Sequence, residues 1–315
     1  MYKFHEATDK LFFSDIVKEA KYDLAGLIEK EEKSYKHSIN DIASWLLDEH
    51  RNFIFLTGPS ASGKTTTAIF LGQQIMASGK KAFRISLDNF YKNREELPFW
   101  RDGSKNFETI KGLDLDCFHE TVEKLFKEGH AKFPRFDFKT GTRMEGRTFD
   151  IEYDENTFII FEGIHALNPI MYDFIDPEKL AKIYVSVHTD FIDDQKNRIL
   201  RGQDFRLCRR LIRDFVARGT DPDFTLGMWE KVCLGEEKYI RPYRQNSDIA
   251  INSLHSYEMF VYKDFILEYE KAIVNPDHRV FLERILKLFQ NCPSLSRDII
   301  PPTSLLNEFL PKIEI

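Results

Sequence analysis

Apolar residues recur at two different spacings along the chain, and the two spacings predict an alternation of strands and helices. A short apolar run that meets glycine at once, typical of a buried strand, occupies residues 52–57, and residues 81–87 read as a second strand. Residues 157–164 and 182–187 read as further buried strands. Elsewhere the apolar residues return every three or four positions, as they do on one face of a helix. This alternation favours a mostly parallel sheet covered by helices on both faces.

Four stretches outside these strands have patterns of their own. A helix is predicted from Lys64 to about Ala77, directly after a glycine-rich turn. Residues 113–129 read as a capped helix that a glycine ends. Residues 132–152 have the pattern of a short hairpin, and residues 205–240 are helical and rich in arginine.

Both ends of the chain are predicted to be helical extensions of one central domain. Within residues 1–50, apolar residues between Ile39 and Leu47 recur at helical spacing, so one face of this segment should be buried. We expect an N-terminal helical extension over residues 1–50, a core over 51–255 and a C-terminal helical extension over 256–315. Packing against the core is the expected role of both extensions, with self-association into a homo-oligomer as the alternative.

Composition excludes several classes of protein. The 315 residues are 42% hydrophobic and 30% charged, as in ordinary globular proteins, and a formal net charge of −6 gives no electrostatic reason to expect a nucleic-acid partner. No apolar run approaches the roughly 20 residues of a membrane span, and the first ten residues lack a signal-peptide pattern. The four cysteines form no CxxC pair and have no metal-ligand spacing. We therefore expect a cytoplasmic protein with reduced thiols and neither nucleic-acid nor membrane partners.

One segment carries a motif whose chemistry is specific. GPSASGKT, residues 58–65, fits the pattern G-x-x-x-x-G-K-[ST], follows a predicted buried strand and opens a predicted helix. Its glycines let backbone N–H groups face phosphates, and the helix N-terminus favours negative charge. Lys64 would reach the β- and γ-phosphates of ATP, and the Thr65 hydroxyl would ligate Mg²⁺. The alternative is a glycine-rich turn with an exposed lysine. The expected nucleotide-binding residues of this segment are Gly58, Pro59, Ser60, Ala61, Ser62, Gly63, Lys64, Thr65 and Thr66.

Two carboxylates stand where predicted parallel strands end, at the edge of the sheet where ligands gather in open α/β folds. Asp88 follows RISL, and Glu162 follows FIIF. Phosphoryl transfer to an alcohol needs a group that orients the hydroxyl and accepts its proton, and an acid near the metal. Asp88 suits the first role and Glu162 the second. Taken alone, each could equally be a helix cap or a solvated loop acid.

The stretch RLCRRLIRDFVARG, which ends at Gly219, predicts a helix that carries a cluster of arginines. Its apolar stripe implies that the arginines cannot all be buried with it. Such a cluster suits a lid that closes over ATP and stabilises charge on the moving phosphoryl group, and the alternative is a solvated basic face. Gly219 is expected to end the helix and could serve as a hinge. The arginines of this stretch are Arg206, Arg209, Arg210, Arg213 and Arg218.

Together these motifs resemble the uridine kinase/phosphoribulokinase family of P-loop kinases. The matches run in order over most of residues 52–252: GPSASGKT, SLDNFY, NFE, PRFDF followed by Arg143, FEGI, RLCRRLIRDFVARG and GEEKYIRPYRQNSDIAI. IPPTSLLNEF near the C-terminus is similar to the tail of bacterial nucleoside kinases that carry an N-terminal TGS domain, for which residues 1–50 are too few. The resemblance implies an α/β fold of the P-loop, nucleoside-monophosphate-kinase-like type, with a five-stranded parallel sheet flanked by helices and an arginine-rich lid.

The resemblance also implies roles for residues around the phosphates. Asp88 would be the general base that acts on the 5′-hydroxyl of the substrate. Glu162 would belong to the magnesium site. Arg213 and Arg218 would contact the ATP phosphates from the lid.

On the acceptor side, the resemblance places the ribose near Glu108 and Arg210, and Glu108 stands where uridine kinases carry an aspartate. Phe136 and Phe138 of PRFDF are the other expected acceptor-binding residues. Uridine kinases typically read the pyrimidine with a tyrosine and a histidine, whereas the matching positions here are Phe136 and Gly141. Because a buried hydrogen-bonding site discriminates strongly between ligands, this replacement should relax or redirect the choice of base.

The expected activity is ATP-dependent phosphorylation of a hydroxyl on a nucleoside-like small molecule, such as uridine or cytidine. Related kinases that act like phosphoribulokinase or pantothenate kinase share the architecture and are alternatives. PRFDF with Arg143 fits the nucleoside branch better, and pantothenate kinases usually carry a histidine after the aspartate that matches Asp88. A non-catalytic ATP-binding regulatory module is an alternative of a different class, and the pair Lys64 and Asp88 argues against it.

Overall fold

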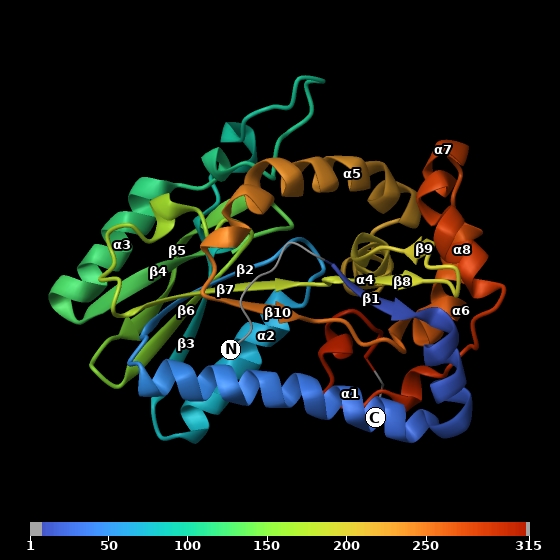
Figure 1. The fold of residues 1–315 in the computed structure, drawn as a ribbon. Coiled ribbons are helices and arrows are strands. Elements are labelled where there is room, and N and C mark those ends of the chain that lie inside the picture. The colour runs from blue at the N-terminus through green and yellow to red at the C-terminus, as the bar shows by residue number, and fades with distance from the viewer. Residues whose placement is uncertain (1–7, 313–315) are drawn as a thin grey trace.

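A computed structural model describes residues 8–312 of the chain, and a five-stranded parallel sheet lies at its centre (Figure 1). The strands lie in the order β10-β7-β2-β6-β3, and every neighbouring pair is parallel. The predicted sheet is therefore confirmed, and the strand before the glycine-rich motif is its middle member. The strands are β2 (Phe53–Thr57), β3 (Lys81–Ser86), β6 (Thr157–Glu162), β7 (Leu180–Ser186) and β10 (Ile249–Asn252).

Helices cover both faces of this sheet, as the alternation of elements predicted. In Figure 1, α1 and α2 lie on one side of the sheet, and α3 lies on the other beside the hairpin β4–β5. Gly129 ends α3 in the left-handed conformation, with φ of 74°, as expected of a glycine stop. The helices are α1 (Phe13–Asp48), α2 (Lys64–Ala77), α3 (Leu115–Glu128), α4 (Gly202–Arg218), α5 (Pro222–Gly235), α6 (Glu258–Glu270), α7 (Pro276–Arg279) and α8 (Glu283–Phe289).

Strand β2 divides its side chains between two apolar cores, because successive residues of a strand point to opposite faces. Ile54 and Leu56 belong to the larger core, which includes α1, α2 and the C-terminal helices. Phe53 and Phe55 belong to the second core, which includes α3 and the hairpin. Both terminal extensions thus share a core with the sheet. The expected domain boundaries stay predictions, and residues 1–7 and 313–315 lie outside the described part of the chain.

Two smaller sheets lie beside the main one. The hairpin expected over residues 132–152 consists of antiparallel strands β4 (His130–Asp137) and β5 (Thr142–Glu152). The other sheet, which the sequence did not predict, contains β1 (Asp9–Phe12), β8 (Thr189–Ile192) and β9 (Arg198–Leu200). Its strands are three or four residues long, too short for an apolar period to show. Between residues 8 and 312, no helix combines the length and the apolar character needed to cross a membrane.

Candidate active site

The glycine-rich motif forms a tight loop between β2 and α2. A Cβ atom on Gly58 would come within 2.1 Å of the Val185 carbonyl oxygen, so only glycine fits there. Gly63 has φ of 85° and Ala61 has φ of 58°, and these left-handed residues curl the backbone. The side chain of Ser62 is fully buried, and its hydroxyl has no hydrogen-bond partner within residues 8–312. The loop thus has the shape and the unsatisfied polar groups of an anion cradle.

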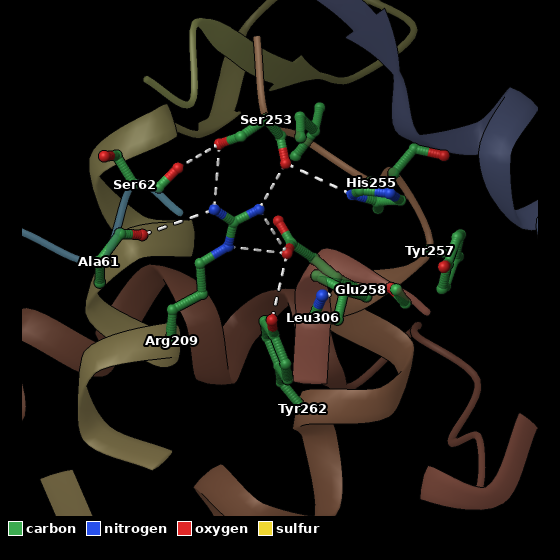
Figure 2. Close-up of polar contacts among 12 residues, drawn as sticks. Ala61, Ser62, Arg209, Ser253, His255, Tyr257, Glu258, Tyr262 and Leu306 are labelled. Carbon is green, nitrogen blue, oxygen red and sulfur yellow. Dashed lines mark hydrogen bonds and ion pairs between the residues drawn. The ribbon is translucent and has the colours of Figure 1, made fainter. Parts of the chain in front are cut away.

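A buried ion pair holds this loop from behind (Figure 2). Arg209 and Glu258 are both fully buried, and the Arg209 Nε donates to Glu258 Oε2 at 2.9 Å. The Arg209 Nη2 donates to the Ser253 carbonyl at 2.7 Å, and the Ser253 hydroxyl donates to the Ser62 carbonyl at 2.6 Å. Arg209 Nη1 approaches the Ala61 carbonyl at 3.5 Å. Arg209 therefore supports the glycine-rich loop from the core, and it is not one of the exposed arginines that a lid would use.

Two arginines of α4 are buried because each pairs with an acid that lies outside this helix. The apolar stripe of α4 led us to expect that some of its arginines stay outside the core. Arg210, Arg213 and Arg218 are indeed not buried. Arg206 and Arg209 are buried, because Arg206 pairs with Glu236 and Arg209 pairs with Glu258. Charged groups are buried when they are paired in this way. Neither acid is evident as a partner from the sequence, since each lies at least thirty residues away.

Asp88 and Glu162 lie at the ends of neighbouring strands. Ser86, the last residue of β3, pairs in register with Glu162, the last residue of β6, and Asp88 follows in the turn after β3. Arg84 Nη1 lies 2.9 Å from Glu162 Oε1. Because β6 also flanks β2, both acids stand beside the loop that begins α2. The structure thus brings the predicted acids and Lys64 to one edge of the sheet.

Burial and the neighbouring charges both shift the pKa values of the two carboxylates. Burial raises the pKa of Asp88 above its usual range, and the charges of Lys64 and Arg218 oppose that rise. Burial likewise raises the pKa of Glu162, again against the charge of Lys64, while the neighbouring Asp88 adds to the rise. Both carboxylates are therefore more basic than they would be in water.

Three arginines expected at the lid or the acceptor gather around one buried acid. Asp214 is only 3% exposed, and it accepts ion pairs from Arg210 at 3.3 Å, Arg213 at 2.9 Å and Arg218 at 3.2 Å. Arg210 also donates to the Ser60 hydroxyl at 2.8 Å, which connects the cluster to the glycine-rich loop. Sequence reasoning missed Asp214, although its position within the arginine stretch was a signal. Beyond it, Gly219 ends the helix with φ of 62°, as expected.

Glu108, an expected acceptor-binding residue, is half-buried near the same charges. Burial raises its pKa to about 7, and the charges of Arg210 and Lys64 oppose this rise. A Cβ atom on Gly235 would come within 2.4 Å of the Glu108 Cβ, so the end of α5 packs directly on this side chain. The structure therefore places Glu108 close to Arg210 and to the loop lysine.

The positions that matched the base-reading residues have an unexpected neighbour. The Phe136 ring lies 6.1 Å from that of Tyr91 and 5.2 Å from that of Phe138, and Phe138 is 60% exposed. Gly141 has φ of 72°, and a Cβ there would lie 2.6 Å from Arg94 Nε. The Arg94 backbone N–H donates to the Gly141 carbonyl at 2.8 Å. Arg94 thus occupies the space beside Gly141, and its place in a polar loop gave no signal of this.

The motif implies ATP and Mg²⁺, and the residues present fit both. The curled loop, the buried hydroxyl of Ser62 and the start of α2 offer donors to phosphate oxygens. The Thr65 hydroxyl and the Glu162 carboxylate are oxygen ligands of the kind that Mg²⁺ prefers.

Comparison with known proteins gives consistent matches. Residues 53–259, more than half of the chain, match the sequence model of the Phosphoribulokinase / Uridine kinase family. A uridine kinase of Bacillus pumilus is 27% identical over 200 residues, which are 63% of this chain and 84% of that protein. The uridine kinase of Saccharomyces cerevisiae is 29% identical over 261 residues, which are 80% of this chain and 47% of the yeast protein.

A solved structure agrees at the level of the fold. A kinase from Silicibacter sp. TM1040 that is named for a fructose transport system superposes with a TM-score of 0.51. It is 18% identical, and the match covers 68% of this chain and 98% of that one. Loop, strand order and family match agree: the chain is an ATP-dependent kinase that belongs to the phosphoribulokinase/uridine kinase family.

Proposed function

We propose that the protein transfers the γ-phosphate of ATP to a hydroxyl of a nucleoside-like molecule, with uridine and cytidine as the first candidates. The observation that carries this proposal is the placement of Asp88 and Glu162 at the ends of adjacent strands, within the electrostatic reach of Lys64. The similarity to uridine kinases supports the choice of acceptor class.

In this proposal Asp88 orients the acceptor hydroxyl and receives its proton. Burial raises the pKa of Asp88, and a carboxylate with a raised pKa is a stronger base. Lys64, Arg213 and Arg218 would hold the phosphates and balance the charge that spreads over the moving group. Thr65 and Glu162 would hold Mg²⁺, which supplies further positive charge at the phosphate oxygens when it is bound.

The acceptor would lie between Glu108 and the aromatic rings of Tyr91, Phe136 and Phe138. Glu108 and Arg210 offer an acceptor and donors for the hydroxyl groups of a sugar. Phe136 and Tyr91 supply apolar ring surface for a flat base, and Phe138 lies at its exposed end.

The direct test follows ADP release by the purified protein with Mg·ATP and a panel of acceptors. The panel contains uridine, cytidine, purine nucleosides, ribulose 5-phosphate and pantothenate. Turnover with a pyrimidine nucleoside supports the proposal and shows that Phe136 and Gly141 admit such a base. Silence with every nucleoside, together with turnover of another acceptor, would reject the nucleoside assignment.

One observation favours a second candidate acceptor, a small molecule that carries a negative charge. The Arg94 guanidinium lies against Gly141, where uridine kinases typically carry a histidine. A guanidinium binds phosphate or carboxylate well, and ribulose 5-phosphate and pantothenate carry such groups. If this candidate is right, Arg94→Ala lowers turnover of the anionic acceptor, whereas Arg101→Ala, an exposed control in the same loop, does not.

A further inference from the structure

The C-terminal residues 304–310, here called the tail segment, pack against the glycine-rich loop. Leu305 and Leu306 are fully buried, and Phe309 is 1% exposed. A Cβ on Gly63 would lie 2.7 Å from Leu305 Cδ1, so the tail segment touches the loop at its last glycine. The Phe309 ring lies 5.0 Å from the guanidinium of Arg209, the same side chain that holds the loop from behind. Leu306 borders this network in Figure 2.

One carboxylate of the tail segment is bonded to the start of α2. Glu308 Oε2 accepts hydrogen bonds from the Thr66 backbone N–H at 3.1 Å and from the Thr66 hydroxyl at 2.7 Å. Thr66 is the third residue of α2, so its N–H has no acceptor within the helix. Backbone donors of this kind, at a helix N-terminus that follows a glycine-rich loop, are the groups that cradle nucleotide phosphates.

The charge of Glu308 also reaches the metal side of the site. It contributes to the raised pKa of Glu162, after the larger effects of burial and of Asp88. The contact with Thr66 places the Glu308 carboxylate at the N-terminus of α2, beside the expected position of the phosphates, where a negative charge repels a polyphosphate.

We propose that Glu308 competes with a nucleotide phosphate for the two donors of Thr66, so that the tail segment restrains ATP binding. The inference rests on the proposed placement of the phosphates at the glycine-rich loop. Nucleotide binding then releases Thr66 by rotation of the Glu308 side chain, because Leu305, Leu306 and Phe309 anchor the backbone around it. The restraint is built into the empty enzyme and disappears in the nucleotide complex.

The test compares the wild type with Glu308→Gln by isothermal titration calorimetry, in the absence of any acceptor. Glutamine keeps an oxygen that can accept from Thr66 but carries no charge. We expect Mg·ATP and inorganic tripolyphosphate to bind about 10-fold more tightly to the variant, as charged hydrogen bonds of this strength imply, and adenosine to bind unchanged. Asp298→Asn, an exposed position in the same C-terminal region, removes an equal charge and should leave all three affinities unchanged.

Other outcomes overturn the inference in distinct ways. Unchanged or weaker binding of tripolyphosphate to Glu308→Gln shows that the carboxylate does not compete with phosphate. Loss of adenosine affinity with unchanged tripolyphosphate affinity assigns Glu308 to the sugar instead. If Glu308→Gln fails to fold, Glu308→Asp decides by the same titrations, because its shorter side chain withdraws the carboxylate from Thr66. Failure of the proposed function would appear separately, as nucleotide binding without turnover of any acceptor.

Discussion

Three carboxyl groups of the candidate site have pKa values that are shifted in the same direction by the same causes. The carboxyls of Asp88, Glu108 and Glu162 each have a pKa raised mainly by burial, and the charge of Lys64 opposes the rise in all three. One lysine therefore keeps three crowded acids closer to their ionised forms. The positive charge of Lys64 also offsets part of the electrostatic repulsion among the three carboxylates, which allows them to lie close to one another.

The first prediction concerns the proposed base. Asp88→Asn keeps the shape of the side chain but removes its ability to accept a proton, so turnover should fall by about 10²- to 10⁴-fold. Affinity for Mg·ATP, measured by calorimetry, should change little. Asp116→Asn, an exposed aspartate at the start of α3, serves as the control and should be fully active. A fully active Asp88→Asn would contradict the assigned role.

The second prediction concerns the effect of pH on stability. The pKa of Glu108 in the folded protein is about 7, above the ordinary value of 4.5, so the folded state binds this proton more tightly than the unfolded state. Its contribution to stability is therefore present at low pH and is lost as pH rises from about 4.5 to about 7. Glu108→Gln should raise the melting temperature relative to the wild type more at pH 8 than at pH 5. The exposed Glu120→Gln should show no such difference, and an equal shift of Glu108→Gln at both pH values would refute the argument.

Among single residues, the sequence could predict those site residues whose position follows from a local motif or from the end of a strand. Lys64 follows from the motif, and Asp88 and Glu162 follow from the ends of predicted parallel strands. Arg94 and Glu308 could not be predicted as site residues, because their contacts join segments that only the folded chain brings together. Thr66 and Glu308, for example, are 242 residues apart.

Among the elements, α4 has a second role beside the lid that its arginines led us to predict. One side of it presents Arg210, Arg213 and Arg218 around Asp214, and the buried Arg209 holds the backbone of the glycine-rich loop. The same helix thus connects the arginine cluster around Asp214 to the glycine-rich loop. A displacement of α4 would therefore move both the arginines around Asp214 and the backbone of the glycine-rich loop.

The third prediction tests the buried pair that makes this connection. Arg209→Met leaves the Glu258 carboxylate buried without its cation, which should cost about 3–5 kcal/mol in the free energy of unfolding. The double variant Arg209→Met, Glu258→Met should be more stable than the single one, since no charge is then left unpaired. Urea denaturation measures both. Nucleotide affinity should fall in the two variants alike, because both lose the guanidinium that holds the loop, and retained affinity would show that the loop needs no such support.

Sequence patterns predicted elements well where apolar runs are long. β2 and β6 are mostly apolar runs, every residue of which is buried, and α2 and α3 have clear starts and ends. The sheet of β1, β8 and β9 escaped prediction, because pairing of such short strands depends on the folded chain and not on their own composition.

Across residues 8–312, both extensions pack against the central sheet. The larger core contains side chains from α1, from the central sheet and from the tail segment. The Lys36 ammonium donates to the Thr303 hydroxyl at 2.8 Å, so α1 also contacts the C-terminal region at the surface. The described parts of both extensions therefore share an apolar core with the central sheet.

The fourth prediction follows from this shared core. Leu306→Ala removes a fully buried side chain and should destabilise the protein by about 2–5 kcal/mol. Because the tail segment shares the core of the sheet, tryptophan fluorescence and far-ultraviolet circular dichroism should report the same shifted urea transition. Val280→Ala, at a position that is 59% exposed, should change stability little. Two separate transitions would show that the tail unfolds independently of the sheet.

The position of Glu308 has a consequence for the order in which the nucleotide site is completed. A ribosome makes the glycine-rich loop early, but Ser253, Glu258 and Glu308, which contact the loop or its buried arginine, emerge long afterwards. The loop of a nascent chain therefore lacks both its support and its competing carboxylate until these later residues have been made. In a growing chain the phosphate donors of the loop are thus at first neither supported by Arg209 nor opposed by Glu308, and the site takes its final form only when both segments have been made.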